Sequence, residues 1–419
     1  MTTAIFVLAL VAGPAEEISA PPLRFEALLE GALANNPHVL AFTDDARAVL
    51  DRAEARSAFP DPVVGLAVHD LPVPSFSFRE DMMTMSQVAV SQTLPWFGKR
   101  GLARRAEGKG AEAIAAQQAG ASLALAQSLA EAYAELWRID RSRLLLHEQR
   151  DLLDRLASLA RQGLATGAGR QADALLAEAE SAALSQRLVA LDGEEVRVRA
   201  ILGALLAAGA PLPGAPADLP PIALPELADL LERLHRHPEL AAIDHRREAL
   251  LLEAELAEKE VLPDPEVSVA YGVRLMHPDM VGVGVRFPIP IFGASRAERL
   301  AAAARADARA LERRMQGERD ALAAALRGAW ARAAAERERA RLVQTEIVPR
   351  LRQSVRALVA AYEAGAGSLF AVLEQERKRL ERELEGLDAR AAAFVAEVRV
   401  ITAAGDLRLL GAASDEGDR

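Results

Sequence analysis

Cysteine is absent from the 419 residues of this chain. The absence excludes a disulfide framework, a thiolate metal site and a cysteine nucleophile, and it leaves no cysteine near the N-terminus for acylation. Aromatic residues are scarce, at 4% of the chain, whereas Ala, Leu, Glu and Arg dominate. That balance is typical of long helices or coiled coils rather than of an ordinary globular enzyme.

A basic block is also missing. The chain has 60 acidic and 50 basic residues, which gives a net charge of -10, and the charges are spread along its length. Proteins that bind nucleic acid usually gather lysine and arginine on one face or in one segment. We therefore expect no nucleic-acid partner.

Long apolar runs are rare as well. The run Ala4 to Ala12, followed by small residues, resembles the core of a secretory signal peptide, so residues 1–20 are predicted to be one. The basic leading region is missing, which a misassigned start codon would explain. No other run reaches ~18 apolar residues without charge, which argues against a transmembrane helix. If the protein spans a membrane, it must do so with strands.

Catalytic and nucleotide-binding motifs are absent: there is no HExxH, GxSxG, P-loop or dinucleotide glycine pattern. We predict neither enzymatic activity nor a cofactor. His235, His237 and His245 lie close together in the sequence, but arginines accompany them. Such a segment is more typical of a solvated polar helix face than of a metal site.

What the chain does contain is a strand followed by a long helix, and it contains this pair twice. From Ser86 to Leu94 small or polar residues alternate with apolar ones, until a proline ends the strand because it cannot donate to a ladder. Val281 to Phe287 alternates in the same way. The joints between strand and helix are Pro95, Trp96, Phe97 and Gly98 in the first half, and Pro290, Phe292 and Gly293 in the second. We expect the aromatic side chains of the first joint to pack there or to lie at a membrane interface.

The two halves repeat their landmarks at a spacing of roughly 195 to 203 residues, far longer than the ~20–50 residues of a solenoid repeat. Five landmarks occur in the same order in both halves. They are Asn36-Pro37 and His237-Pro238, Pro60-Asp61-Pro62 and Pro263-Asp264-Pro265, LPWFG and IPIFG, Ala132-Tyr133 and Ala329-Trp330, and Gly167-Ala-Gly169 and Gly365-Ala-Gly367. An internal duplication accounts for all five.

Each repeat is predicted to hold a helix of about 20 residues, two strands and a long helical hairpin with a glycine turn at its tip. The first repeat is 21–210, with strands 63–71 and 83–94 and a hairpin 98–206 whose tip is 163–169. A proline-rich linker, 211–225, precedes the second repeat, 226–406, with strands 266–275 and 280–287 and a hairpin 294–404 whose tip is 365–367. Residues 407–419 read as a polar tail. Pro349 is expected to kink the second long helix, and the return helix carries a coiled-coil seam from Leu380 to Ile401.

The strands of the second repeat show an apolar face and a small or polar one. Val281, Val283, Val285 and Phe287 share the first, and two glycines and an arginine share the second. A membrane barrel with a wet interior has this pattern, although a soluble sheet that packs on a helix has it too. Four strands cannot close a barrel, since about eight are needed. Several chains that each contribute four strands would close one and leave no open edge.

The duplicated order of helix, Pro-Asp-Pro, strand pair, LPWFGKR or IPIFG, long helix, glycine turn and return helix resembles the TolC-type outer-membrane efflux proteins, over about residues 23–404. The stretch SQTLPWFGKR resembles the branch that works with heavy-metal or cation pumps. The resemblance implies a homotrimer in the outer membrane of a Gram-negative bacterium, with a twelve-stranded β-barrel in the lipid and a coiled-coil α-helical barrel in the periplasm. It also implies two partners, a periplasmic adaptor protein and an inner-membrane pump, which in this branch is of the RND type.

The resemblance gives the hairpin tips a role. Family members use these tips to contact the adaptor and to close the pore with a ring of acidic side chains. The matching glycines here are Gly163, Gly167, Gly169, Gly365 and Gly367. Glu374 falls where the family places a pore acid, and Asp173 lies near the equivalent point of the first repeat. Three copies of one carboxylate would attract cations, but acids early in a helix are also favoured by the helix dipole alone.

Five of the seven methionines lie in or beside the two strand-hairpin tips. Met82, Met83 and Met85, together with His277, are weak candidates for contacts with Cu(I) or Ag(I), because thioether and imidazole ligands suit soft metals. Methionines also fill apolar loop positions without any metal. We expect no resident metal.

These observations predict a mainly helical protein with a β-barrel part that conducts substrates, with heavy-metal cations as candidates, as the exit duct of a tripartite efflux system. The alternative is a periplasmic coiled-coil adaptor or scaffold without a pore. An adaptor usually has one helical hairpin, whereas this chain has two equal ones, which favours the duct.

Overall fold

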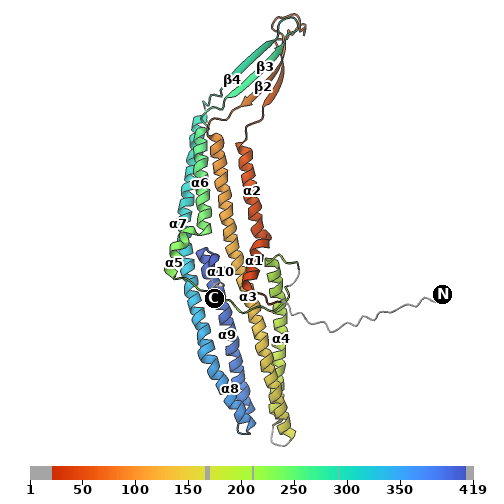
Figure 1. Ribbon diagram of the computed structural model, residues 1–419, viewed down its shortest axis with the longest axis vertical. Helices are drawn as coiled ribbons and strands as arrows, with labels where there is room; N and C mark the ends of the chain where they lie inside the picture. The colour runs from red at the N-terminus through yellow and green to blue at the C-terminus, as the bar shows by residue number, and fades with distance from the viewer. Residues whose placement is uncertain (1–20, 166–169, 210–211, 292, 412–419) are drawn as a thin grey trace, which may run out of the picture.

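The computed structural model describes residues 21–165, 170–209, 212–291 and 293–411. Long helices run side by side along its longest axis, and a small sheet lies at one end (Figure 1). The predicted signal peptide, Gly167, Gly169, Phe292 and residues 412–419 lie outside the described residues.

Two helical hairpins form most of the length. The helix α3, Lys99–Ala165, has 67 residues and is therefore roughly 100 Å long. Alanine, leucine and charged residues fill it without a proline, so no backbone donor is lost along its length. The hairpins are completed by α4 (Gln171–Leu205), α7 (Gly293–Leu342), α8 (Val348–Glu363) and α9 (Leu369–Ala404).

Shorter helices lie beside the hairpins. They are α1 (Phe25–Asn35), α2 (Pro37–Ser57), α5 (Leu227–Arg233), the 3-10 turn Leu234–Arg236, α6 (Pro238–Lys259) and α10 (Arg408–Gly411). Sequence analysis expected α2 and α6 but not α1 or α5. It also read residues 407–419 as a polar tail, which is wrong at its start because α10 is helical and Leu410 is buried. None of the helices in the described parts of the chain combines the length and the apolar character that crossing a bilayer requires.

The four strands form one antiparallel sheet in the order β1-β2-β3-β4. Their bounds are Val63–His69, Met85–Thr93, Glu266–Val273 and Met280–Arg286. The predicted strands are one or two residues longer at some ends. Strands β2 and β3 belong to different repeats, so their pairing joins the two halves of the duplication.

The second long helix changes its winding before Pro349, where sequence analysis expected a kink. Residues Val343–Ile347 form a π-helical turn between α7 and α8. A proline in a helix has no N–H to donate and its ring collides with the carbonyl four residues earlier. The wider π turn removes that collision.

The core lies where the hairpins pack together. The predicted seam of α9 packs in it, with Leu380, Phe394 and Ile401 buried. Phe25 of α1 contacts the rings of Tyr133 and Phe394 at centroid distances of 5.6 and 5.1 Å. The Tyr133 hydroxyl donates to the carbonyls of Leu23 and Ala217, at 2.9 and 3.0 Å. The linker between the repeats is therefore fastened to α3 rather than loose.

The two proline-capped helices begin in equivalent ways. The Asn36 side chain accepts the His38 N–H and donates to the Leu205 carbonyl, each at 2.9 Å. His237 Nδ1 accepts the Glu239 N–H at 3.3 Å, and its ring also bonds the backbone of Thr402. The side chain of His237 is 3% exposed. The expectation that it belongs to a solvated face is wrong, because it caps a helix inside the fold.

This cap predicts a pH effect. Burial lowers the pKa of His237 below its ordinary value of 6.5. The folded state therefore prefers the neutral ring, and its stabilisation is complete above pH 6.5 and lost as the pH falls from 6.5 through the folded pKa. In His237→Asn, which copies the first repeat, we expect a smaller fall in Tm between pH 7.5 and 5.5. Thermal unfolding of both proteins at both pH values tests this, and equal falls would contradict it.

Candidate functional site

The sheet has one apolar face and one face of small or polar side chains. Val88, Val90 and the residues opposite them on neighbouring strands share the apolar face: Val64, Leu66, Val269, Tyr271, Val281 and Val283. Two glycines and two alanines lie on the other face at Gly65, Ala89, Ala270 and Gly282.

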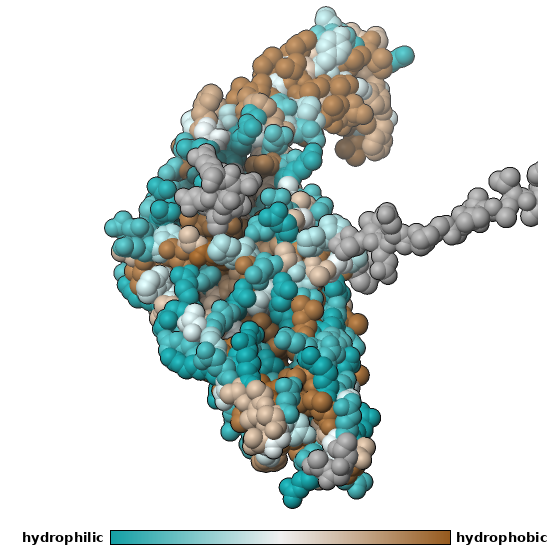
Figure 2. All heavy atoms as spheres, turned by 60° about the horizontal axis from the view of Figure 1, so that its bottom comes forward, coloured by the Kyte–Doolittle hydropathy of each residue, from teal (hydrophilic) through white to brown (hydrophobic). Residues whose placement is uncertain are grey.

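In the isolated chain this apolar face is uncovered. Leu66 is 79% exposed and Val283 is 74% exposed. Apolar side chains cover the sheet end of the molecule in Figure 2. A contiguous apolar surface of this kind marks a membrane or protein contact. The small and polar residues on the opposite face are what a wet barrel interior contains.

The two outer strands leave open edges. Strand β1 pairs only with β2, and β4 pairs only with β3, among the described residues. An open edge presents unpaired N–H and C=O groups, which favour pairing with another chain. The sheet is therefore prepared for lateral contact with further strands on both sides.

The first joint between sheet and helix is held by the second repeat. Asp264 of the second Pro-Asp-Pro accepts from the Trp96 N–H at 2.6 Å and from Lys99 Nζ at 2.9 Å. Lys99 Nζ also donates to the Leu262 carbonyl at 2.8 Å. The Leu94 N–H donates to the Pro265 carbonyl at 2.8 Å. The Pro-Asp-Pro motif therefore has a role that its sequence does not reveal: it fixes the neighbouring repeat's strand exit.

The aromatic residues of this joint are not alike. Trp96 is half-buried and meets Phe97 edge to face, with ring centroids 6.3 Å apart. Phe97 itself is 89% exposed, so within one chain it does not pack at the joint. Exposure agrees with the other expectation, that it lies at a membrane interface. In the second joint Pro290 and Gly293 open α7, and the Gly293 N–H donates to the Pro290 carbonyl at 3.1 Å.

The tip of the second hairpin depends on its glycines. Gly365 has a φ of +74° and follows α8, and the Ala366 N–H returns to the Ala361 carbonyl at 2.9 Å. This is a Schellman ending, which requires the left-handed conformation that glycine adopts most readily. A Cβ on Gly367 would lie 2.8 Å from the Tyr362 nitrogen. In the first hairpin Gly163 lies in the last turn of α3, so that helix continues further than predicted.

The two predicted pore acids lie close to these tips. Asp173 is in the first turn of α4. Burial raises the pKa of Tyr362, and the charge of Asp173 adds to the shift, so the two tips are neighbours. Glu374 is half-buried and lies 3.9 Å from both Arg377 Nη2 and Lys378 Nζ. Each acid is thus near the end of a hairpin, and among the described residues neither forms an ion pair shorter than 3.9 Å.

The hairpin methionines lie at the opposite end. Met82 and Met83 are exposed in the loop between β1 and β2, and Met85 begins β2. His277 lies between β3 and β4. In the described parts of the chain, the histidine and carboxylate atoms that approach within ligand distance of one another belong to a different set, Glu112, His245 and Glu248.

A charged network that sequence analysis missed lies inside the hairpins. Arg379 is 8% exposed and donates to Glu376 and Glu383, at 2.7 and 2.8 Å, and to Gln149 of α3. Arg352 of α8 reaches the other oxygen of Glu383 at 2.7 Å. The network therefore connects α3, α8 and α9. In the sequence, the signal that could have indicated this network is the spacing of Glu376, Arg379 and Glu383, three and four residues apart on the face of α9 that carries the seam.

The fold is similar to those of several solved structures. The chain is similar to the outer-membrane channel OprN, with 19% identity, a TM-score of 0.73 and coverage of 91% of this chain and 89% of that one. Its similarity to CusC gives 18% identity, a TM-score of 0.75 and coverage of 91% and 92%. Its similarity to VceC from Vibrio cholerae gives 19% identity, a TM-score of 0.71 and coverage of 91% of this chain and 96% of that one. No curated protein sequence matches the chain significantly.

The fold similarity to these three proteins extends over 91% of this chain. Residues 230–406, the second repeat, also match the family described as Outer membrane efflux protein. The family match therefore covers the second repeat, and the fold similarity extends over both repeats. The resemblance inferred from the repeated motifs agrees with this match of the second repeat.

Proposed function

We propose that three copies of this chain form the exit duct of a tripartite efflux system, with a periplasmic adaptor and an inner-membrane pump as partners. The observation that carries the proposal is a four-stranded sheet with one exposed apolar face and two open edges, attached to helical hairpins whose first helix is roughly 100 Å long. The family resemblance of the repeated motifs implies a homotrimer. Three sheets give twelve strands, enough to close a barrel, whereas one sheet cannot close.

The duplication supports a definite way of joining the copies. Within one chain, β2 of the first repeat pairs with β3, the first strand of the second repeat. Between chains, β4 takes the place of β2 and β1 of the next copy takes the place of β3. The alternation of strand directions is kept, so every junction in the ring is antiparallel. Open edges then disappear, as a lipid environment requires.

The register of that contact follows from the repeats. Val90 lies opposite Val269 within the chain. The first strands of the repeats correspond at a spacing of 203 residues, and the second strands at 195, because Pro60 matches Pro263 and Pro95 matches Pro290. Val285 therefore lies opposite Leu66 of the next copy, and both belong to the apolar face. All twelve strands would then present one continuous apolar band to lipid.

The hairpin tips are proposed to dock on the adaptor and to narrow the pore. Gly163, Gly167, Gly169, Gly365 and Gly367 belong to the docking tips, and Glu374 and Asp173 to an acidic ring. Of these residues, Gly163, Asp173, Gly365, Gly367 and Glu374 are described, and their position near the ends of the hairpins supports this role. The resemblance of SQTLPWFGKR and the methionines near the other end favour heavy-metal cations over organic solutes as cargo, and an RND-type pump as the partner.

A conductance experiment tests the proposal. Detergent-extracted protein in a planar bilayer is expected to produce discrete conductance steps that divalent cations block from the side of the tips. In Glu374→Ala the block should need several-fold more cation, because three charges leave the ring. Glu255→Ala, on an exposed part of α6 far from the tips, is the control. Unchanged block would show that Glu374 does not belong to the ring. A protein that never conducts would contradict the duct and favour the alternative, an adaptor or scaffold without a pore.

A further inference from the structure

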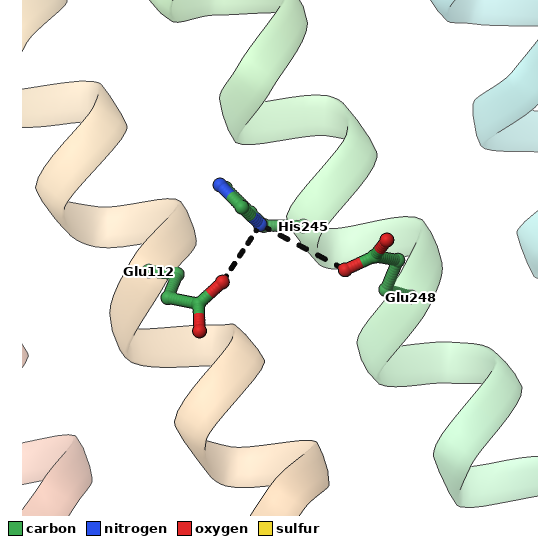
Figure 3. A group of neighbouring side chains, drawn as sticks. All are labelled: Glu112, His245 and Glu248. Atoms are coloured by element: carbon green, nitrogen blue, oxygen red, sulfur yellow. Dashed lines mark ion pairs between the residues drawn. The ribbon is translucent and has the colours of Figure 1, made fainter.

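Two helices from different repeats bring three potential metal ligands together near the upper end of α3. His245 and Glu248 lie three residues apart on α6, and Glu112 faces them from α3 (Figure 3). His245 Nδ1 is 3.0 Å from Glu112 Oε2 and 3.9 Å from Glu248 Oε2. One ligand atom from each of the three residues lies within 4.8 Å of the others. The imidazole nitrogen points between the two carboxylates.

The His245 nitrogen has the environment of an unused ligand. It is buried from solvent and makes no hydrogen bond, although the side chain as a whole is 30% exposed. The Glu112 oxygen lies 3.0 Å from this nitrogen, but the two atoms do not have the angles of an N–H···O hydrogen bond. A buried ring nitrogen without a hydrogen bond is uncommon, and a lone pair that points to a cation would satisfy it.

The separations suit a first-row transition metal. Zinc binds histidine nitrogen at about 2.0–2.1 Å and carboxylate oxygen at about 2.0–2.2 Å, so tetrahedral ligand atoms lie roughly 3.3 Å apart. The distances from His245 Nδ1 to the Glu112 and Glu248 oxygens, 3.0 and 3.9 Å, bracket that value. One imidazole and two carboxylates form a ligand set that suits zinc and its neighbours rather than the soft ions Cu(I) and Ag(I). Calcium and magnesium prefer oxygen ligands alone.

A lysine at present provides the positive charge of the cluster. Lys109 Nζ is 2.7 Å from Glu112 Oε2 and 3.0 Å from Glu248 Oε2, the same oxygens that approach His245. With neutral histidine, two carboxylates and one ammonium give the cluster a net charge of -1. A divalent ion that replaces the ammonium brings the charge to zero. Lys109 is 32% exposed on its side chain and opens onto a groove of about 640 Å³, so it can move into solvent.

We propose that Glu112, His245 and Glu248 form a binding site for a divalent transition metal such as zinc, and that the ion takes the place of the Lys109 ammonium. The fourth position of the metal opens onto the groove, which Arg104, Gly108 and Leu251 also line. The ion would connect α3 of the first repeat to α6 of the second. The site is separate from the hairpin methionines and from the acidic tips, and it does not depend on the transported cargo.

The test is a titration of the full chain, stripped of metal with a chelator, with Zn²⁺ alone at pH 7.5. We expect one saturable site per chain by calorimetry and a rise in Tm on binding. His245→Asn and Glu248→Gln should each weaken binding at least tenfold. His235→Asn, an exposed histidine whose Nδ1 contacts a backbone carbonyl, is the matched control and should leave binding unchanged.

Lys109→Gln supplies a result that misfolding cannot imitate, because it should bind Zn²⁺ several-fold more tightly than the native chain. Co²⁺ absorption in the same variant should show the intense visible bands of a four- or five-coordinate site. Three outcomes would overturn the proposal. The first is that His245→Asn binds Zn²⁺ within twofold of the native affinity, and the second is that neither the native chain nor Lys109→Gln shows saturable binding up to 1 mM. The third is that Lys109→Gln binds Zn²⁺ and the native chain does not. The last outcome would mean that the lysine holds the position permanently.

Discussion

Arg379→Met is expected to destabilise the protein by about 3–5 kcal/mol, the cost of leaving buried charges without a partner. Arg379 is 8% exposed, and its two acidic partners Glu376 and Glu383 are 2% and 6% exposed on their side chains. Methionine fills a similar volume but cannot donate to either carboxylate. One of the acids must then be protonated or rehydrated, and each alternative costs free energy.

The comparison that isolates this effect is Arg377→Met, two residues away on the same helix. Arg377 is 57% exposed and lies 3.9 Å from its nearest acid, so its loss should cost about 0–1 kcal/mol. Urea unfolding of the detergent-solubilised proteins measures both. If the midpoints of the two variants fall together, the network does not hold α3, α8 and α9 as the distances indicate.

Lys99→Met should have the second largest effect, a loss of about 1.5–3 kcal/mol, which is the range for hydrogen bonds to charged groups. Lys99 is 7% exposed on its side chain and donates to Asp264 and to the Leu262 carbonyl. Without it the carbonyl loses its donor and the aspartate keeps only the Trp96 N–H. The joint between the sheet and α3 should loosen first.

Limited proteolysis near residues 94–99, together with urea unfolding, measures the expected loosening. Arg104→Met is the control, because Arg104 is 66% exposed and 3.8 Å from Glu54. Equal protease resistance in Lys99→Met and the native chain would contradict the role given to this joint. The second repeat has Ala294 at the equivalent position, so only one of the two joints in each chain should respond.

The parts of the fold that sequence analysis predicted are those with short-range causes. Pro95 ends a strand wherever the rest of the chain lies, and the Val281–Val285 alternation needs only the two-residue period of a strand. Gly365 likewise has its positive φ because a helix ends there. The duplication supports the paired helices, strands and glycine turns, because those signals occur in both repeats.

The parts that were missed depend on packing between distant segments. His237 follows Arg236 and precedes Pro238-Glu239, but it is buried, since α9 and Gly405 pack against it. Glu112 and His245 are 133 residues apart and meet only because α3 and α6 lie side by side. Asp264 of the second repeat accepts the N–H of Trp96, which follows a strand of the first repeat. A local sequence pattern does not predict such contacts, because they depend on how the helices and strands of one repeat align with those of the other.

The most direct test of the account is a disulfide cross-link between copies at the proposed junction of β4 and β1. The chain has no cysteine, so Leu66→Cys with Val285→Cys introduces the only pair. Within one chain two strands separate β1 from β4, a distance of roughly 14 Å that a disulfide cannot bridge. We predict that oxidation yields covalent trimers on a non-reducing gel. Val64→Cys with Val285→Cys, shifted by two residues along β1, should remain monomeric. No cross-link in the first pair, or an equal cross-link in both, would contradict the ring of twelve strands built from three copies.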